Sequence, residues 1–152
     1  MIKGKIARPL PIADSVKPKR NTKHSGEIAE LEFMVRAARR NLRVLKPYGD
    51  NQRYDCLVES GSKLSRIQIK STNNVVGRGL LHVNCGRRAS HGPTPYLPSE
   101  VDFLAIHAIP EDSWYIIPIE KVFPRISLLI YPRNHRKPGV FGDYYEAWHL
   151  LE

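Results

Sequence analysis

The stretch that decides the fold is YDCLVESGSKLSRIQIKS, residues 54–71. It contains two runs of strand-forming residues, 54–59 and 64–71, separated by Ser-Gly-Ser-Lys. Gly61 suits the first loop position of a type II′ turn, because glycine readily adopts a positive φ there. The pattern therefore predicts a β-hairpin whose two-residue loop is Gly61-Ser62.

This hairpin is expected to bring polar residues together on one face. With that loop, the numbers of directly paired residues sum to 123, so Asp55 faces Gln68. Lys70 is then the diagonal neighbour of Asp55, at roughly 7 to 8 Å. Because side chains alternate along a strand, Gln68 and Lys70 share a face with Arg66, and Ile67 and Ile69 point to the other face.

An amphipathic helix is predicted before the hairpin. Ser25 is its expected N-cap, and apolar residues recur at helical spacing at Ile28, Leu31, Met34, Val35, Ala38 and Leu42. Glu27 falls within about 50° of the centre of this stripe, whereas Glu30 and Glu32 lie roughly twice as far away. We therefore expect Glu27 to point toward the sheet. A carboxylate aimed at a protein interior is unfavourable unless it is paired or binds a metal, which favours a functional role.

Glu27 on a first helix, followed by Asp55, a hairpin and Gln68-x-Lys70, resembles the metal-dependent PD-(D/E)XK nuclease superfamily. Most members have Asp or Glu two residues before the lysine. Gln68 in that place resembles the branch of group I intron-encoded homing endonucleases and their free-standing bacterial relatives. The resemblance covers about residues 24 to 150, through segments such as Gly26-Glu27-Ile28-Ala29-Glu30, Arg53-Tyr54-Asp55 and Trp114-Tyr115-Ile116-Ile117-Pro118.

The resemblance implies a restriction-endonuclease-like core with the catalytic set Glu27, Asp55, Gln68 and Lys70. Asp55 and the backbone carbonyl of Ile69 would bind Mg²⁺, with Mn²⁺ as a substitute, and Glu27 would be a direct or water-mediated third ligand. Lys70 would orient the attacking water and stabilise the charge of the transition state. Gln68 offers only a neutral oxygen, so it should bind metal more weakly than a carboxylate. The implied substrate is double-stranded DNA, and cutting both strands implies a homo-oligomer, either a dimer or a tetramer.

The rest of the chain completes a single α/β domain over residues 25–152, with a central mixed sheet flanked by helices. Further strands are predicted at 80–85, 101–108, 114–119 and 126–131, and helices at 119–123 and 144–151.

Residues 86–99 contain three prolines and no acidic residue, which predicts a long loop. We expect Arg87, Arg88 and His91 of this loop, together with Arg78, to contact DNA phosphates. Tyr96 is expected either to stack on a base or to anchor the loop.

The charge of the chain indicates a polyanionic partner. The 152 residues include 24 Lys and Arg against 15 Asp and Glu, a net charge of +9. Residues 1–24 hold seven basic side chains and one acidic one, and predict a basic, proline-containing arm outside the domain. Two cysteines and the lack of a secretory leader favour the cytoplasm. The apolar runs are too short to predict a membrane span.

Several alternatives remain open at this stage. Asp55 and Lys70 would also form an ordinary exposed ion pair, and Glu27 would also complement the helix dipole. Asp102 is expected to form a turn or to support the site rather than to bind metal. Three other functions fit the charge: a DNA-binding module on a nuclease fold that no longer cuts, an RNA-binding or ribosome-associated protein, and a nuclease that resolves branched DNA.

Overall fold

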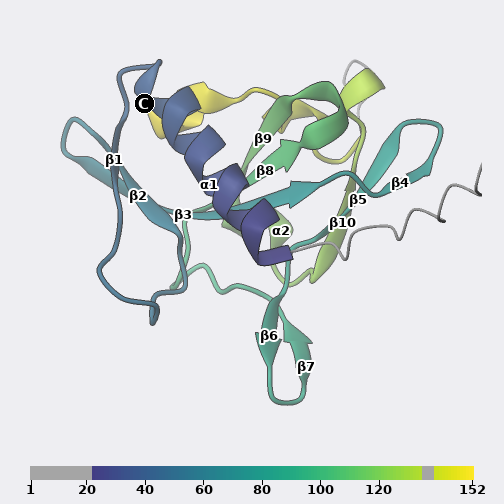
Figure 1. Cartoon of the computed structure of the whole chain (residues 1–152), viewed down its shortest axis with the longest axis horizontal. Coiled ribbons are helices and arrows are strands. Elements are labelled where there is room, and N and C mark those ends of the chain that lie inside the picture. Colours follow the sequence, from purple (N-terminus) through teal and green to yellow (C-terminus); the bar gives the residue numbers. More distant parts are fainter. Residues whose placement is uncertain (1–21, 135–138) are drawn as a thin grey trace, which may run out of the picture.

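A five-stranded mixed sheet forms the centre of the computed structural model, which describes residues 22–134 and 139–152 (Figure 1). The strands lie in the order β1-β2-β3-β8-β9; β3 and β8 are parallel, and the other neighbours are antiparallel. Their bounds are β1 (Arg43–Leu45), β2 (Cys56–Ser60), β3 (Lys63–Thr72), β8 (Phe103–Ala108) and β9 (Ser113–Pro118). The predicted α/β class with a mixed central sheet is confirmed.

Both faces of this sheet are covered. One face packs against a three-stranded antiparallel sheet of β4 (Val75–Gly77), β5 (Leu80–Asn84) and β10 (Ser127–Ile130), together with the short helix α2 (Ile119–Val122). The other face packs against α1 (Thr22–Ala38) and the 3₁₀ helix η4 (Trp148–Leu151). Because the central strands are enclosed from both sides, β8 and β9 are buried over nearly their whole length, which explains their mostly apolar sequences.

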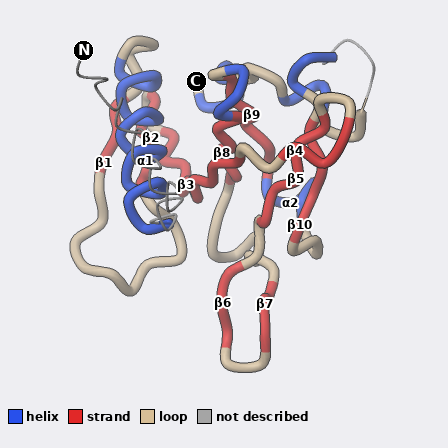
Figure 2. Tube along the Cα trace, turned by 45° about the vertical axis from the view of Figure 1, so that its right-hand side comes forward, coloured by secondary structure: helices blue, strands red, loops and turns tan. Residues whose placement is uncertain are grey.

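Segment 86–99 was wrongly predicted as a long loop without strands. It contains a hairpin of β6 (Arg87–Ala89) and β7 (Gly92–Thr94), which projects from the body of the molecule (Figures 1 and 2). Gly92 has φ +109°, a conformation that side chains rarely adopt, so glycine permits the turn. The paired stretches are only three residues long, too short to show a period in the sequence.

The ends of the domain also differ from the expectation. Ser25 lies inside α1, which includes Thr22, so the predicted N-cap was wrong and residues 22–24 of the predicted arm are helical. The rest of that arm lies outside the described residues. The predicted closing helix is replaced by the 3₁₀ helices η3 (Gly142–Tyr144) and η4, and further 3₁₀ turns are η1 (Ile109–Glu111) and η2 (Pro132–Asn134).

Helix α1 buries a different face from the predicted one. Ala29, Phe33 and Ala37 are buried, whereas Leu31, at the centre of the predicted stripe, is 59% exposed. The two alanines let the helix approach the sheet closely, and the Phe33 ring lies 5.6 Å from that of Trp114 and 5.3 Å from that of Trp148. Both faces of α1 carry apolar residues at helical spacing, and packing against the two tryptophans selects between them.

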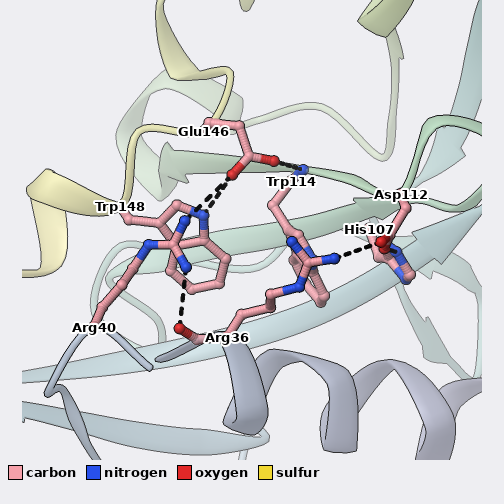
Figure 3. A network of polar contacts seen from close by, with 7 residues as sticks. All are labelled: Arg36, Arg40, His107, Asp112, Trp114, Glu146 and Trp148. Carbon is pink, nitrogen blue, oxygen red and sulfur yellow. Dashed lines mark hydrogen bonds and ion pairs between the residues drawn. The ribbon is translucent and has the colours of Figure 1, made fainter. Parts of the chain in front are cut away.

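A polar network fixes the rotation of α1 (Figure 3). Arg36 donates to Asp112 Oδ2 at 2.5 Å, and Asp112 also contacts His107, whose ring stacks on Trp114 at 4.7 Å.

Arg40 lies 4.5 Å above the ring of Trp148 and 3.7 Å from Glu146. The carboxylate of Glu146 in turn accepts hydrogen bonds from Trp114 N at 2.7 Å and Trp148 Nε1 at 2.8 Å. The helix is therefore bound to the η1 turn and to the C-terminal segment at once.

Candidate active site

The hairpin of β2 and β3 has the predicted register. Cys56 pairs with Ile67 and Ser60 with Lys63, so the paired numbers sum to 123, and Gly61 has φ +58° as the predicted turn requires. β2 begins at Cys56, which pairs with Ile67, whereas β3 continues beyond Ile67 to Thr72. The two strands therefore diverge at this point, which we call the fork. Asp55 stands at this fork, where its N–H donates to the Ile67 carbonyl at 2.8 Å.

Asp55 and Gln68 meet as predicted. Oδ2 of Asp55 accepts a hydrogen bond from Gln68 Nε2 at 2.7 Å and a second one from the Ile69 N–H at 2.7 Å. Gln68 is only 7% exposed, and its Nε2 also lies 3.3 Å from the Ile69 carbonyl oxygen. Burial raises the pKa of Asp55; the hydrogen bond from Ile69 opposes this effect, and the nearby charge of Glu30 adds to it.

Lys70 lies on the same face of β3, partly buried. Its Nζ is 3.5 Å from the hydroxyl oxygen of Tyr96 and 5.4 Å from the centre of that ring. Burial lowers the pKa of Lys70, and the negative charge of Asp55 partly offsets this effect. The Lys70 side chain is therefore partly buried beside Tyr96.

The helix carboxylate at the site is Glu30, and the predicted orientation of Glu27 was wrong. The Glu27 side chain is 57% exposed and lies 3.9 Å from His24 Nδ1 on the outer side of α1. Glu30 instead lines a cleft of about 400 Å³ together with Asp55, Gln68, Ile69 and Lys70. Glu30 also pairs with Lys46, which follows β1. The error follows directly from the wrong choice of buried helix face, since rotating α1 exchanges the two glutamates.

The cleft contains the donor atoms that a hard divalent cation requires. Glu30 and Asp55 supply two carboxylates, Ile69 has a neutral backbone oxygen, and Gln68 has a side-chain amide whose nitrogen is bound to Asp55. In the described part of the chain, no group of three or more His, Cys, Asp and Glu side chains is placed to bind a metal. A metal at this cleft would thus need neutral oxygens beside the two carboxylates. The charge of Glu30 raises the pKa of Asp55, whereas the positive charges of Lys70 and Lys46 lower it.

The predicted DNA-contacting residues lie on two separate hairpins. Arg88 and His91 are exposed on the β6–β7 hairpin, and Arg78 is exposed at the turn between β4 and β5. Arg87 is less accessible, because it is drawn to Glu100 at 3.9 Å.

Sequence reasoning missed the role of Glu100. It also lies 3.7 Å from Arg53, and it accepts a hydrogen bond from the Leu97 N–H at 3.2 Å. Its position just before a strand gave no signal of these contacts. Asp102 accepts hydrogen bonds from the backbone and side chain of Arg66, which is not among the residues that line the cleft.

The fold and the fork agree with a family of nucleases. The family model described as PD-(D/E)XK endonuclease matches residues 20–151, and the chain belongs to this family. The superfamily and the restriction-endonuclease-like fold predicted from the sequence are confirmed.

Two solved structures illustrate the relationship. The chain is similar to a bacterial homing endonuclease, I-Ssp6803I, with 30% identity and a TM-score of 0.72 over 86% of this chain and 93% of that one. It also resembles Hjc, a Holliday junction resolvase of the archaeal hyperthermophile Archaeoglobus fulgidus, with 12% identity and a TM-score of 0.51 over 84% and 95% of the two chains. The second likeness concerns the fold alone. No curated protein matches the chain. Within the described residues, no helix is long and apolar enough to cross a membrane.

Proposed function

We propose that this nuclease is a Mg²⁺-dependent DNA endonuclease whose active site is the cleft at the fork of β2 and β3. The observation that carries the proposal is the meeting of Glu30, Asp55, Gln68 and Lys70 at one place. An ordinary surface ion pair would require neither the buried amide of Gln68 nor a second carboxylate from α1.

Asp55, Glu30 and the Ile69 carbonyl are the proposed metal ligands, with Glu30 in the role first assigned to Glu27. Mg²⁺ prefers oxygen ligands, and Mn²⁺ accepts the same set. When bound, the ion supplies positive charge at the scissile phosphate and makes water more acidic. The carboxylate of Asp55 is already fixed for this purpose, because Gln68 and the Ile69 backbone both donate to its Oδ2.

Lys70 is the proposed group that contacts the reacting atoms. Its ammonium has three N–H donors, and one of them is directed at Tyr96. The other two can orient the attacking water and bind a phosphate oxygen. A positive charge in a partly buried site stabilises developing negative charge more strongly than one in water. We expect the hydrolysis to leave a 5′ phosphate.

Gln68 has a neutral side chain where most members of the superfamily have a carboxylate. Its Nε2 binds Asp55 in this structure, so turning the amide over would present its oxygen to the cleft instead. A neutral oxygen attracts a cation less strongly than a carboxylate. We therefore propose that Gln68 mainly orients Asp55 and contributes weakly to metal affinity.

Duplex DNA is the proposed substrate, with Arg78, Arg88 and His91 on the two hairpins as phosphate contacts. The likeness to a bacterial homing endonuclease supports a defined target sequence. One cleft cuts one strand, so cutting both strands calls for two chains related by a two-fold axis, in a dimer or a tetramer.

Incubation with supercoiled plasmid tests the proposal. We expect nicked or linear product with Mg²⁺ or Mn²⁺ and none with EDTA. A four-way DNA junction and an RNA duplex of equal length, assayed in parallel, would reveal a branch-resolving or an RNA-directed activity. If DNA is bound but no substrate is cut with either metal, the chain is a DNA-binding module and the proposal is wrong.

A further inference from the structure

In the described part of the chain, the hydroxyl of Tyr96 is the group placed to accept a hydrogen bond from Lys70. The two groups are 3.5 Å apart, and the ammonium lies 5.4 Å from the centre of the tyrosine ring, within the range of a cation–π contact. A lysine side chain has four rotatable bonds and adopts many conformations unless something fixes it. Tyr96 is therefore placed to restrict where the ammonium lies.

Tyr96 itself is firmly held. It is 7% exposed and belongs to the core between the two sheets, where Cys85 and Val101 are among its buried neighbours. This burial excludes the expected alternative in which its ring stacks on a base, and it bears out the alternative of a loop anchor. Burial also raises the pKa of Tyr96 to about 12, so its hydroxyl is neutral and can accept a hydrogen bond from an ammonium group.

The position of Tyr96 in the chain connects Lys70 to the β6–β7 hairpin. Tyr96 follows β7 by two residues, and the next residue, Leu97, is bound through its N–H to Glu100. Glu100 also attracts Arg87 of β6 and Arg53 of the loop before Asp55. The base of the hairpin, Tyr96 and the loop leading to Asp55 thus share one set of contacts.

We infer that Tyr96 is a positioning residue for the Lys70 ammonium, which it fixes at the fork through its hydroxyl and its ring. This inference rests on the proposed nuclease function. Tyr96 does not touch the reacting atoms; it acts through Lys70. Its removal should impair the chemical step while leaving the DNA-contacting surface unchanged.

Two substitutions separate the contributions of the hydroxyl and the ring. Tyr96→Phe keeps the ring and removes the hydrogen bond, so we expect the single-turnover rate of plasmid nicking to fall about three- to tenfold. Tyr96→Leu removes both contacts and should lower the rate about tenfold further. The Kd for DNA, measured in EDTA, should stay within about twofold of the wild-type value in both variants. A general loss of structure would weaken binding and rate together.

Tyr115→Phe is the matched control. Tyr115 is 1% exposed in the same core, and its hydroxyl lies near the backbone of Tyr131 rather than near a cleft residue. This variant loses a buried hydroxyl as Tyr96→Phe does, and thermal unfolding would compare their stabilities. We expect Tyr115→Phe to retain the wild-type nicking rate.

A second readout does not depend on cleavage. In protein labelled with ¹³C at lysine Cε, the Lys70 signal can be assigned by its loss in Lys70→Arg. We expect this signal to be displaced by the Tyr96 ring in the wild-type chain and in Tyr96→Phe, and to move toward the signals of exposed lysines in Tyr96→Leu. A signal that does not move in Tyr96→Leu would overturn the contact.

The outcomes distinguish the two proposals. If the wild-type chain nicks DNA and both Tyr96 variants nick it at the same rate, the positioning role is wrong while the nuclease stands. If the wild-type chain cuts no nucleic acid, the proposed function fails, and with it the role of Tyr96 in catalysis. A reduced rate with unchanged Kd and a displaced Lys70 signal supports both.

Discussion

The carboxylate of Asp55 is stabilised by two hydrogen bonds and is nevertheless unfavourable for the fold. Burial is the largest influence on its pKa and raises it above the ordinary value. When folding raises the pKa of a carboxyl group, the free energy of unfolding decreases as the pH rises from the pKa in the unfolded state through the pKa in the folded state. At neutral pH, the charge of Asp55 therefore lowers the free energy of unfolding.

Replacing Asp55 by Asn should separate stability from activity. Asp55→Asn removes the buried charge and keeps an oxygen that can accept from Ile69, so we expect a higher midpoint of thermal unfolding at pH 7. We also expect nicking to fall by about 100-fold or more, because a proposed metal ligand is lost. Calorimetry and plasmid nicking on the same preparation would check both results. An active Asn variant would show that Asp55 is not a ligand.

Glu30 and Glu27 form a matched pair on one helix. Glu30→Gln should reduce nicking by about tenfold or more, because Glu30 lines the cleft beside Asp55. Glu27→Gln changes an exposed side chain and should nick at the wild-type rate. Measuring the Mg²⁺ concentration for half-maximal rate would show whether Glu30 acts through metal affinity. The reverse pattern would restore the original assignment to Glu27.

At the residue scale, the sequence alone predicted the contacts within the hairpin of β2 and β3. The pairing of Asp55 with Gln68 follows from the turn alone, because a two-residue loop fixes the register. The choice between Glu27 and Glu30 depends on which face of α1 meets the sheet. That choice depends on Trp114 and Trp148, which are more than 70 residues away along the chain and which no local pattern connects to the helix.

Helix α1 provides a test of packing at the scale of a whole element. Phe33 is fully buried among aromatic rings, so Phe33→Ala should lower the free energy of unfolding by about 3 to 5 kcal/mol. Leu31 is exposed, and Leu31→Ala should change the free energy of unfolding by no more than about 0.5 kcal/mol. Urea unfolding of the two variants checks this. Comparable losses would mean that Leu31 is covered, as the hydropathy pattern first indicated.

The β6–β7 hairpin is expected to act through charge. Arg88 is exposed and is not paired with Glu100 as Arg87 is. Arg88→Ala should therefore weaken DNA binding without altering the fold. Loss of one phosphate contact should reduce the slope of log K against log salt concentration by about 0.9. Fluorescence anisotropy at salt concentrations from about 50 to 200 mM would measure this slope. An unchanged slope would place the hairpin away from DNA.

The elements that the sequence did not reveal are short or depend on distant partners. β4, β6 and β7 have three residues each, which is too short to show a hydrophobic period in the sequence. The buried strands β8 and β9 were predicted within two residues, because most of their residues are apolar.

For the whole molecule, the central sheet is covered on both faces, and the cleft lies at the fork of β2 and β3. α1 covers one face and the second sheet the other, and the cleft lies where β3 extends beyond the start of β2. The fold thus places two carboxylates, an amide and an ammonium at one end of the hairpin, close to Tyr96.

The most direct test of the central claim is the nicking rate of the wild-type chain beside that of Lys70→Ala, with both shown to be folded by circular dichroism and to bind DNA. We predict that the wild-type chain nicks supercoiled plasmid with Mg²⁺ and that Lys70→Ala nicks it at least about 100-fold more slowly with a similar Kd for DNA. Wild-type nicking by Lys70→Ala, or nicking that persists in EDTA, would contradict an active site at this fork.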